Sequence, residues 1–200
     1  MITIIDYGAG NIGSITNMLL RLGKSCEVTN DPEKIKKATK LILPGVGKFD
    51  YGMTKLKESG LTEILNEKVL GEKIPILGIC LGAQLMTKSS EEGEMSGLSW
   101  FDAEVVKFNG ETKRIPHMGW NSVHSCIDDI MTANLPENPR FYFVHSYYIH
   151  SNRPDEIMFT TIYGHEFVSG LMKNNIYAVQ FHPEKSHKFG IQLFKNFLSI

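Results

Sequence analysis

The first half of the chain alternates short apolar runs with segments of helical periodicity. Runs rich in isoleucine and leucine, each of a length typical of a buried strand, occupy Ile2–Ile5, Lys40–Leu43 and residues 74–79. Apolar residues recur every three or four positions over residues 11–22, which predicts an amphipathic helix that ends at Gly23. Two further helices are predicted over residues 50–56 and 61–70. Strands that alternate with helices predict a parallel sheet covered by helices.

In the second half the pattern changes to alternating apolar and polar positions, as in residues 103–108 and 140–144. Turns are predicted at residues 109–110 and 163–164, and a strand at 176–181. A closing helix over 186–198 is expected to turn four apolar residues inward: Phe189, Leu193, Phe194 and Phe197. The predicted fold class is therefore α/β, with a mainly parallel central sheet flanked by helices and additional antiparallel strands in the C-terminal half.

Length and composition narrow the possibilities further. A chain of 200 residues, 42 % hydrophobic and 22 % charged, predicts a single globular domain over residues 1–200. The formal net charge of −1 predicts no nucleic-acid partner, and no apolar stretch is long enough to predict a membrane span. The three cysteines are widely spaced and form no CxxC pair, which favours the reducing cytoplasm and predicts no metal site.

The stretch GICLGAQ, residues 78–84, places a cysteine between two glycines at the end of an apolar run. A strand that ends at a cysteine and turns at once into a helix must bend sharply, and Gly78 and Gly82 permit close approach of neighbouring elements. The bend presents the Cys80 sulfur and sets the N–H of Leu81 beside a developing oxyanion, while the helix start favours the thiolate. The alternative is a buried cysteine that packs as a small apolar side chain.

A histidine and a glutamate, in the tripeptide HPE, follow the late strand. His182 can accept the thiol proton and later protonate a leaving amine, while Glu184 holds the imidazole. Because sites in open α/β sheets collect at the carboxyl ends of strands, Cys80 and His182 are predicted to share one site. At a third strand end, residues 44–47, glycines flank Val46, so a peptide N–H there can serve as a second oxyanion donor. A structural histidine and a plain turn remain the alternatives.

With these residues assembled, the chain resembles class I, triad-type glutamine amidotransferases, and more narrowly the glutaminase subunits of imidazole glycerol phosphate synthases. GICLGxQ and the late HPE mark the broad class. The narrower resemblance depends on PHMGWN at residues 116–121, FVHSYY at 143–148 and FHPEKS at 181–186. It covers nearly the whole chain. Ala83, where many relatives carry methionine, departs from the pattern and alters only the packing behind Cys80.

The resemblance implies a role for each matching residue. Cys80 would attack the side-chain amide of glutamine, His182 would relay protons, and Glu184 would hold His182. The amides of Val46 and Leu81 would form the oxyanion hole. A further set would hold the glutamine: Gly47, Gln84, Glu92, His145, Ser146 and Tyr147. The reaction would pass through a thioester and would use no cofactor and no metal.

The resemblance also implies a partner, because ammonia released into water becomes ammonium and must instead pass to a second site through a dry route. In the resembled enzymes that site belongs to a (βα)₈ cyclase subunit of histidine biosynthesis, so a heterodimer is expected, with a glutaminase that is slow alone. The predicted partner interface contains His117, Met118, Trp120, Asn121 and Lys185. The default interpretation of the segment that contains Trp120 is core and turn.

Several alternatives stay open at this level. Residues 8–13 read GAGNIG, a literal GxGxxG after a strand, with Asp31 beyond it, which is also typical of NAD(P)-binding oxidoreductases. Seven histidines allow a metal hydrolase, although no HExxH spacing is present. The remaining alternatives are a non-catalytic binding protein and a paralogous subunit that feeds ammonia to another synthase, such as a sugar-amidating enzyme of surface-glycan synthesis.

Overall fold

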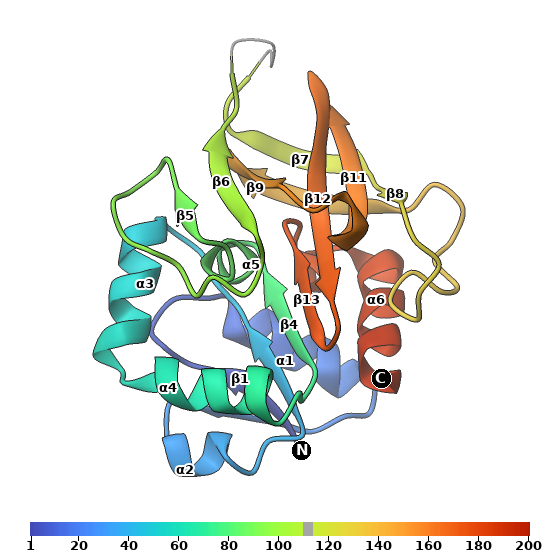
Figure 1. Cartoon of the computed structure of the whole chain (residues 1–200). Coiled ribbons are helices and arrows are strands. Elements are labelled where there is room, and N and C mark those ends of the chain that lie inside the picture. Colours follow the sequence, from blue (N-terminus) through green and yellow to red (C-terminus); the bar gives the residue numbers. More distant parts are fainter. Residues whose placement is uncertain (110–113) are drawn as a thin grey trace.

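The computed structural model describes residues 1–109 and 114–200, and a large twisted sheet lies at its centre (Figure 1). The helices are α1 (Ile12–Arg21), α2 (Pro32–Ile35), α3 (Phe49–Glu58), α4 (Leu61–Asn66), α5 (Leu81–Leu85) and α6 (His187–Ser199), with short helical turns η1 (Glu67–Gly71), η2 (Pro154–Glu156) and η3 (Pro183–Lys185). The strands are β1 (Ile2–Ile5), β2 (Cys26–Thr29), β3 (Lys40–Leu43), β4 (Ile76–Ile79), β5 (Ser89–Ser90), β6 (Ala103–Lys107), β7 (His117–Ser122), β8 (His124–Ser125), β9 (Arg140–His145), β10 (Tyr147–Ser151), β11 (Ile157–Tyr163), β12 (His165–Lys173) and β13 (Ile176–Val179).

The sheet is parallel at one side and antiparallel at the other. Its strand order is β2-β1-β3-β4-β13-β12-β10-β6-β5, and β11 and β8 continue from β12. The strands from β2 to β13 run parallel, whereas β12, β10 and β6 join as antiparallel neighbours. A separate antiparallel pair, β7 and β9, lies beside this half. The predicted fold class, with its parallel core and antiparallel extension, is confirmed.

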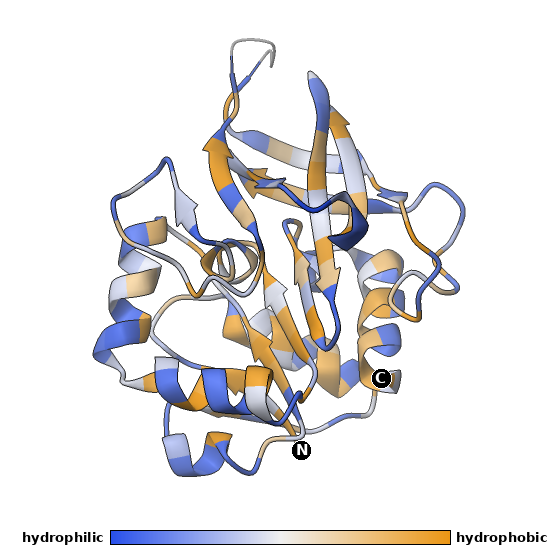
Figure 2. Cartoon of the chain, viewed as in Figure 1, coloured by the Kyte–Doolittle hydropathy of each residue, from blue (hydrophilic) through white to orange (hydrophobic). Residues whose placement is uncertain are grey.

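Helices cover both faces of the parallel strands, because successive side chains of a strand point to opposite faces. Ile5, Leu41 and Leu43 pack in one core cluster with α3, α4 and α5. Ile4 and Ile42 pack in a second cluster with α1 and α6. Figure 2 shows the resulting distribution, with hydrophobic central strands and helices whose outer positions are hydrophilic. The molecule therefore has three layers, and the carboxyl ends of the parallel strands meet along one edge.

The structure differs from the sequence predictions at several element ends. The edge strand β2 was not predicted, since its four residues carry no apolar run. β4 begins at Ile76 rather than at residue 74 because Pro75 has no N–H to donate to the sheet. The helix predicted over residues 61–70 is α4 as far as Asn66, and the chain then continues as the π-helical turn η1. The turn predicted at residues 163–164 is confirmed, with Gly164 at φ +80°. The turn predicted at 109–110 includes residue 110, which lies outside the described residues.

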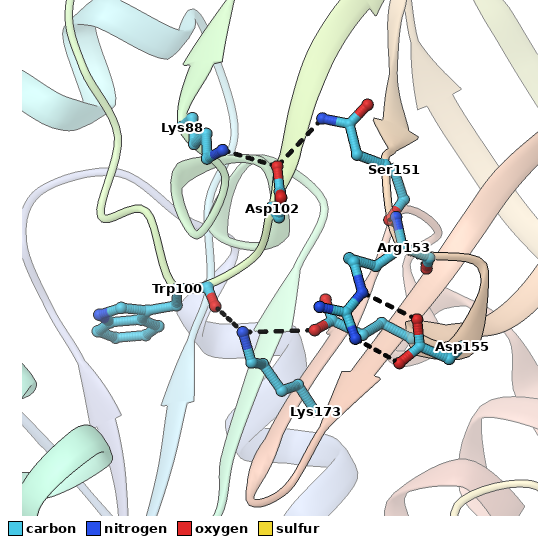
Figure 3. Close-up of polar contacts among 9 residues, drawn as sticks. Lys88, Trp100, Asp102, Ser151, Arg153, Asp155 and Lys173 are labelled. Atoms are coloured by element: carbon cyan, nitrogen blue, oxygen red, sulfur yellow. Dashed lines mark hydrogen bonds and ion pairs between the residues drawn. The ribbon is translucent and has the colours of Figure 1, made fainter.

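A network of charged groups ties the loops at the start of the antiparallel half (Figure 3). Lys173 donates to the Trp100 carbonyl at 3.3 Å and pairs with the buried Glu156 at 3.3 Å. Asp102 accepts from Lys88 at 2.6 Å and from Asn152 at 3.1 Å. These contacts join the loops before β6 and after β10, and the far ends of these two strands border the site described next.

Candidate active site

Cys80 lies at a sharp bend between β4 and α5. Its N–H donates to the Val179 carbonyl at 2.8 Å, continuing the β4–β13 pairing, while its own carbonyl already accepts from Ala83 at the start of the helix. The backbone of Cys80 has φ 53° and ψ −112°, a conformation that residues other than glycine rarely adopt. Such strain is typical of functional positions, and it turns the sulfur away from the strand toward the edge of the sheet.

The glycines around Cys80 permit the bend for a steric reason. A Cβ added at Gly82 would overlap the Leu43 carbonyl oxygen, and one added at Gly78 would lie 2.7 Å from the Met86 methyl carbon. The end of β3 therefore packs directly on the backbone of α5. The close approach predicted from the sequence is confirmed.

His182 and Glu184 form a buried pair directly after β13. The imidazole Nδ1 lies 2.7 Å from Glu184 Oε1, and both side chains are almost fully buried. The backbone N–H of His182 donates to the Tyr142 carbonyl at 2.8 Å, and the Ser186 hydroxyl donates to the His182 carbonyl at 2.6 Å. With Nδ1 held by the carboxylate, Nε2 is the nitrogen left to serve the sulfur of Cys80.

Opposing effects set the pKa of His182. Burial lowers it, whereas the charge interaction with Cys80 and the hydrogen bond to Glu184 raise it. The balance raises the pKa of His182 to about 10. At neutral pH the imidazole is therefore protonated beside the sulfur, which is the charge arrangement that favours a reactive thiolate.

A cavity of about 340 Å³ opens above Cys80. Its walls bring together the sequence-predicted nucleophile, oxyanion and binding residues with Pro116 and Val144, two residues that were not predicted. The lining is Val46, Gly47, Cys80, Leu81, Gln84, Glu92, Pro116, Val144, His145, Ser146, Tyr147 and His182. Of the predicted triad, Glu184 alone is outside this lining, since it lies behind His182.

The Tyr147 carbonyl joins two hydrogen-bond chains in the cavity wall. It accepts from Gln84 Nε2 at 3.1 Å and from the His145 ring at 2.8 Å. Gln84 Nε2 also donates to Gln180 Oε1 at 2.9 Å, and Gln180 Nε2 donates to the Cys80 sulfur at 3.8 Å. Tyr147, in the segment predicted to bind glutamine, is therefore linked to the Cys80 sulfur through two buried amides. Sequence reasoning missed Gln180, whose only signal was a polar residue at the end of an apolar strand.

His117 and His145 form a second chain, with 2.9 Å between His117 Nδ1 and His145 Nε2. His145 Nδ1 must donate to the Tyr147 carbonyl, so its Nε2 accepts and His117 Nδ1 is the donor. Asn121 Nδ2 lies 3.2 Å from the remaining nitrogen of His117, Nε2. Burial lowers the pKa of His117 to about 4 and that of His145 to about 3, so both rings are neutral at pH 7.

These lowered pKa values predict an acid-sensitive stability. Between pH 4 and 6.5 a neutral buried histidine binds fewer protons than the same residue in the unfolded chain, so stability falls as the pH is lowered. For His117→Asn, the loss of stability between pH 7 and pH 5 should be smaller than in the wild type by about 2 kcal/mol. Urea unfolding at both pH values measures this difference. The exposed His150→Asn is the control, and an unchanged pH dependence in His117→Asn would contradict the assignment.

An exposed face adjoins the cavity on β7. Because β7 alternates, Met118 and Trp120 point outward, with 62 % and 38 % of their surfaces exposed. Trp120 stacks on the ring of His187 and contacts Tyr142 edge to face, and the Lys185 ammonium lies 5.8 Å from the centre of the Tyr142 ring. Met118, Trp120, Tyr142, Lys185 and His187 are together called the β7 face below.

Not every predicted interface residue lies on this face. His117 points to the opposite side of β7, is only 3 % exposed, and stacks between the rings of Phe143 and Tyr163. The prediction of direct partner contact is therefore wrong for His117 in this structure, since strand alternation turns it into the core. Asn121 is half-buried and donates to the Ile162 carbonyl at 2.9 Å, so its amide is already engaged.

The glycine-rich loop at residues 8–13 has a structural explanation. A Cβ at Gly10 would lie 2.9 Å from Pro44 Cγ, so the loop packs against the turn that carries Val46. Asp31, the acidic residue that a dinucleotide site would need, caps α2 by accepting from the Glu33 N–H at 2.9 Å. Its side chain thus has a helix-capping role, which weakens the dinucleotide interpretation.

Two further features bear on the kind of site that the chain can hold. Within the described ranges, 1–109 and 114–200, no group of three or more histidine, cysteine, aspartate or glutamate side chains is arranged to hold a metal ion. The helices in the same part of the chain are all too short or too polar to cross a membrane.

The chain is similar in sequence to a well-defined group of proteins. The family model described as "Glutamine amidotransferase class-I" matches residues 3–200. The chain is 59 % identical over 199 residues to imidazole glycerol phosphate synthase subunit HisH 2 of Methanococcus maripaludis, covering 99 % of this chain and 98 % of the relative. Identity to HisH 2 of Pseudomonas aeruginosa is 47 % over 201 residues, with both chains fully covered. Identity to HisH 1 of M. maripaludis, again with full coverage of both chains, is 46 %.

Solved structures show the same architecture. A Thermoplasma acidophilum protein described as "a putative gmp synthase subunit a protein" superposes with a TM-score of 0.74 at 26 % identity, covering 99 % of this chain and 92 % of that one. A structure described as a glutamine amidotransferase superposes with a TM-score of 0.78 at 18 % identity, covering 99 % and 97 %. The second likeness concerns the fold alone.

Proposed function

Because the chain belongs to the class I glutamine amidotransferase family, we propose that it is the glutaminase subunit of an imidazole glycerol phosphate synthase. It hydrolyses glutamine to glutamate and ammonia, and a (βα)₈ cyclase partner uses the ammonia in histidine biosynthesis. The observation that carries this proposal is that Cys80 and His182 line the same cavity. The identities of 59 % and 47 % to subunits named for this synthase support the choice of pathway.

The proposed chemistry is acyl transfer through the Cys80 sulfur. The thiolate attacks the side-chain carbonyl carbon of glutamine, and the oxyanion accepts hydrogen bonds from the N–H groups of Leu81 and Val46. As the carbon–nitrogen bond breaks, His182 gives its proton to the leaving nitrogen, and ammonia departs. Water then attacks the thioester, with His182 as the base, and the carbon–sulfur bond breaks to release glutamate. Glu184 holds the imidazole throughout.

Binding of glutamine is assigned to other residues of the same cavity lining. Glu92 carries a carboxylate into the lining, which suits the α-ammonium group of the substrate. Its Oε2 accepts from the Phe49 N–H at 2.9 Å, so the start of α3 holds this carboxylate in place. Gly47, Gln84 and the segment His145–Tyr147 complete the site. The cavity of about 340 Å³ is large enough for an amino acid.

A partner is required by the fate of ammonia, which in water becomes mostly ammonium and loses its nucleophilicity. The β7 face, with its exposed Met118 and Trp120 and the adjacent Lys185, is the proposed docking surface. Tryptophan and methionine are enriched at the centres of protein interfaces. A partner docked on this face lies against β7, and on the inner side of β7 the His117–His145 pair leads toward the cavity. Docking of the partner raises glutaminase activity.

The docking surface can be tested with Trp120→Ala. Removal of a partly buried indole from an interface centre is expected to weaken partner binding by about 30-fold or more, since such anchors contribute about 2 kcal/mol or more. Titration of the barrel subunit, followed by calorimetry and by glutamate release, measures both affinity and activation. Leu70→Ala, which removes an apolar side chain of similar exposure (51 %) on η1, is the control. Unchanged affinity and activation in Trp120→Ala would refute the assignment.

A second candidate concerns the acceptor of the ammonia. M. maripaludis has subunits numbered HisH 1 and HisH 2, and this chain is 46 % and 59 % identical to them. This difference allows a paralogous role in which the same glutaminase chemistry serves another synthase, such as a sugar-amidating enzyme. Co-purification of the native partner followed by a substrate screen separates the two, because the acceptor binds the other chain. Synthesis of imidazole glycerol phosphate by that complex supports the first assignment, and amidation of a sugar supports the second.

A further inference from the structure

Building on the glutaminase function proposed above, we propose that Gln180 is a further catalytic residue, whose side-chain N–H donates to the Cys80 sulfur and stabilises the thiolate. This role lies outside the predicted triad. It assigns a chemical purpose to an amide that is completely buried at the end of β13.

The position of Gln180 follows from strand pairing. Val179 is the direct neighbour of Ile79 across the parallel β4–β13 pair, so the residues that follow them, Gln180 and Cys80, leave the sheet side by side. The Gln180 N–H donates to the Ser169 carbonyl at 2.9 Å, which fixes its backbone. Gln180 Nε2 lies 3.8 Å from the Cys80 sulfur, within the range of an N–H···S hydrogen bond.

The orientation of the Gln180 amide is set by a chain of donors and acceptors. The Tyr147 carbonyl can only accept, so Gln84 must direct its NH₂ group toward it, at 3.1 Å. The second hydrogen of the same NH₂ group is directed to Gln180, at 2.9 Å, and therefore meets the oxygen of that amide. The Gln180 nitrogen is left facing the sulfur. The side chain thus presents a donor, not an acceptor, to the nucleophile.

A donor at this place acts in two steps of the proposed reaction. Before attack, it stabilises the negative sulfur together with the positively charged His182, and hydrogen bonds to charged groups are the stronger ones. When the thioester is hydrolysed, the carbon–sulfur bond breaks and its electron pair returns to sulfur, where the same N–H accommodates the charge. Gln180 also holds Gln84, so the nucleophile and the binding wall keep a fixed relation.

The test follows alkylation of Cys80 by iodoacetamide as a function of pH. Cys26 and Cys126 are replaced by serine in every protein tested, so that Cys80 is the thiol that reacts. Gln180→Met keeps the length of the side chain and removes the donor. The midpoint of its alkylation profile is expected to move up by about one pH unit, because the thiolate loses a charge-assisted hydrogen bond. Asn196→Leu, which removes a buried amide in α6 bonded to Met131 and Ala133, is the control and should leave the midpoint unchanged.

A second variant protects the test against misfolding. Gln180→Glu keeps the shape of the side chain and places a carboxyl group opposite the thiolate, so the midpoint should move up further than in Gln180→Met. In the complex with the barrel partner, kcat/KM for glutamine should fall about 10-fold or more in both variants. A midpoint that stays at the wild-type value in either folded variant overturns the role of Gln180. If the midpoint shifts in the variants but the wild-type complex releases no glutamate from glutamine, the proposed function is overturned, whereas the contact between Gln180 and the thiolate is supported.

Discussion

Cys80→Ser is expected to reduce glutamine hydrolysis by at least about 10⁴-fold while leaving the fold intact. Serine has nearly the same shape, so the strained bend at φ 53° and the packing of α5 on β3 are preserved. A hydroxyl, however, does not form the anion that His182 stabilises in the wild type, and no thioester can form. Glutamate release by the variant with its partner measures the loss.

The same Cys80→Ser complex provides its own internal control. Synthesis by the partner subunit with added ammonium salt at mildly alkaline pH should continue at the wild-type rate, because that reaction bypasses Cys80. Cys26→Ser and Cys126→Ser remove the other two thiols and should leave glutamine hydrolysis unchanged. Continued hydrolysis of glutamine by Cys80→Ser would show that the nucleophile is misassigned, and a loss of the ammonia-dependent reaction would point to failed docking.

His182→Asn is expected to lower kcat/KM for glutamine by about 10²- to 10⁴-fold, the usual contribution of a positioned acid–base group. Asparagine cannot provide the positive charge beside the sulfur or give a proton to the leaving nitrogen. Glu184→Gln keeps the imidazole but replaces its carboxylate partner, and a smaller loss is expected. A kcat/KM within about 10-fold of the wild-type value in His182→Asn would exclude His182 as the proton relay.

The pKa of His182 adds a pH signature to this prediction. Because the imidazolium is lost only as the pH rises through about 10, wild-type hydrolysis should have its alkaline limb near pH 10, and His182→Asn should lack that limb. The sign for stability follows from the same shift. The pKa of His182 is higher in the folded chain, at about 10, than the ordinary value of about 6.5 in the unfolded chain. Its contribution to the free energy of unfolding is therefore complete below pH 6.5 and is lost as the pH rises toward 10. Urea unfolding at pH 7 and pH 10 compares the two proteins.

Local sequence features determined a large part of this molecule. Short apolar runs such as Ile2–Ile5 and Lys40–Leu43 encode buried strands, because a strand that is covered on both faces carries mainly apolar residues. The bend at Cys80 was predictable because Gly78 and Gly82 allow a contact that any other residue would block. Element ends were less predictable, as at Pro75, where a missing N–H shortens β4.

The residue types of the candidate site were predictable, whereas the positions of its side chains were predictable only in part. Cys80, Gln84, Glu92 and His182 line one cavity, as the strand-end argument and the family resemblance implied. His117 shows the limit, since the family resemblance assigns PHMGWN to the partner interface, whereas alternation along β7 turns its histidine inward and its Met118 outward. The inward ring could be foreseen only once it was known which face of the β7–β9 pair is covered by Tyr163 and Phe167.

By itself, then, the sequence determined which segments become strands, where the chain must bend, and which side chains can serve as nucleophile and base. Only the tertiary structure decided that β4 pairs with β13 in the register Ile79 to Val179, which brings Cys80 beside Gln180 although 100 positions separate them. The physical reason is that side-chain periodicity states which face of a strand is buried but not which distant strand becomes its neighbour. That choice depends on the packing of the complete core, and the contacts at the sulfur follow from it.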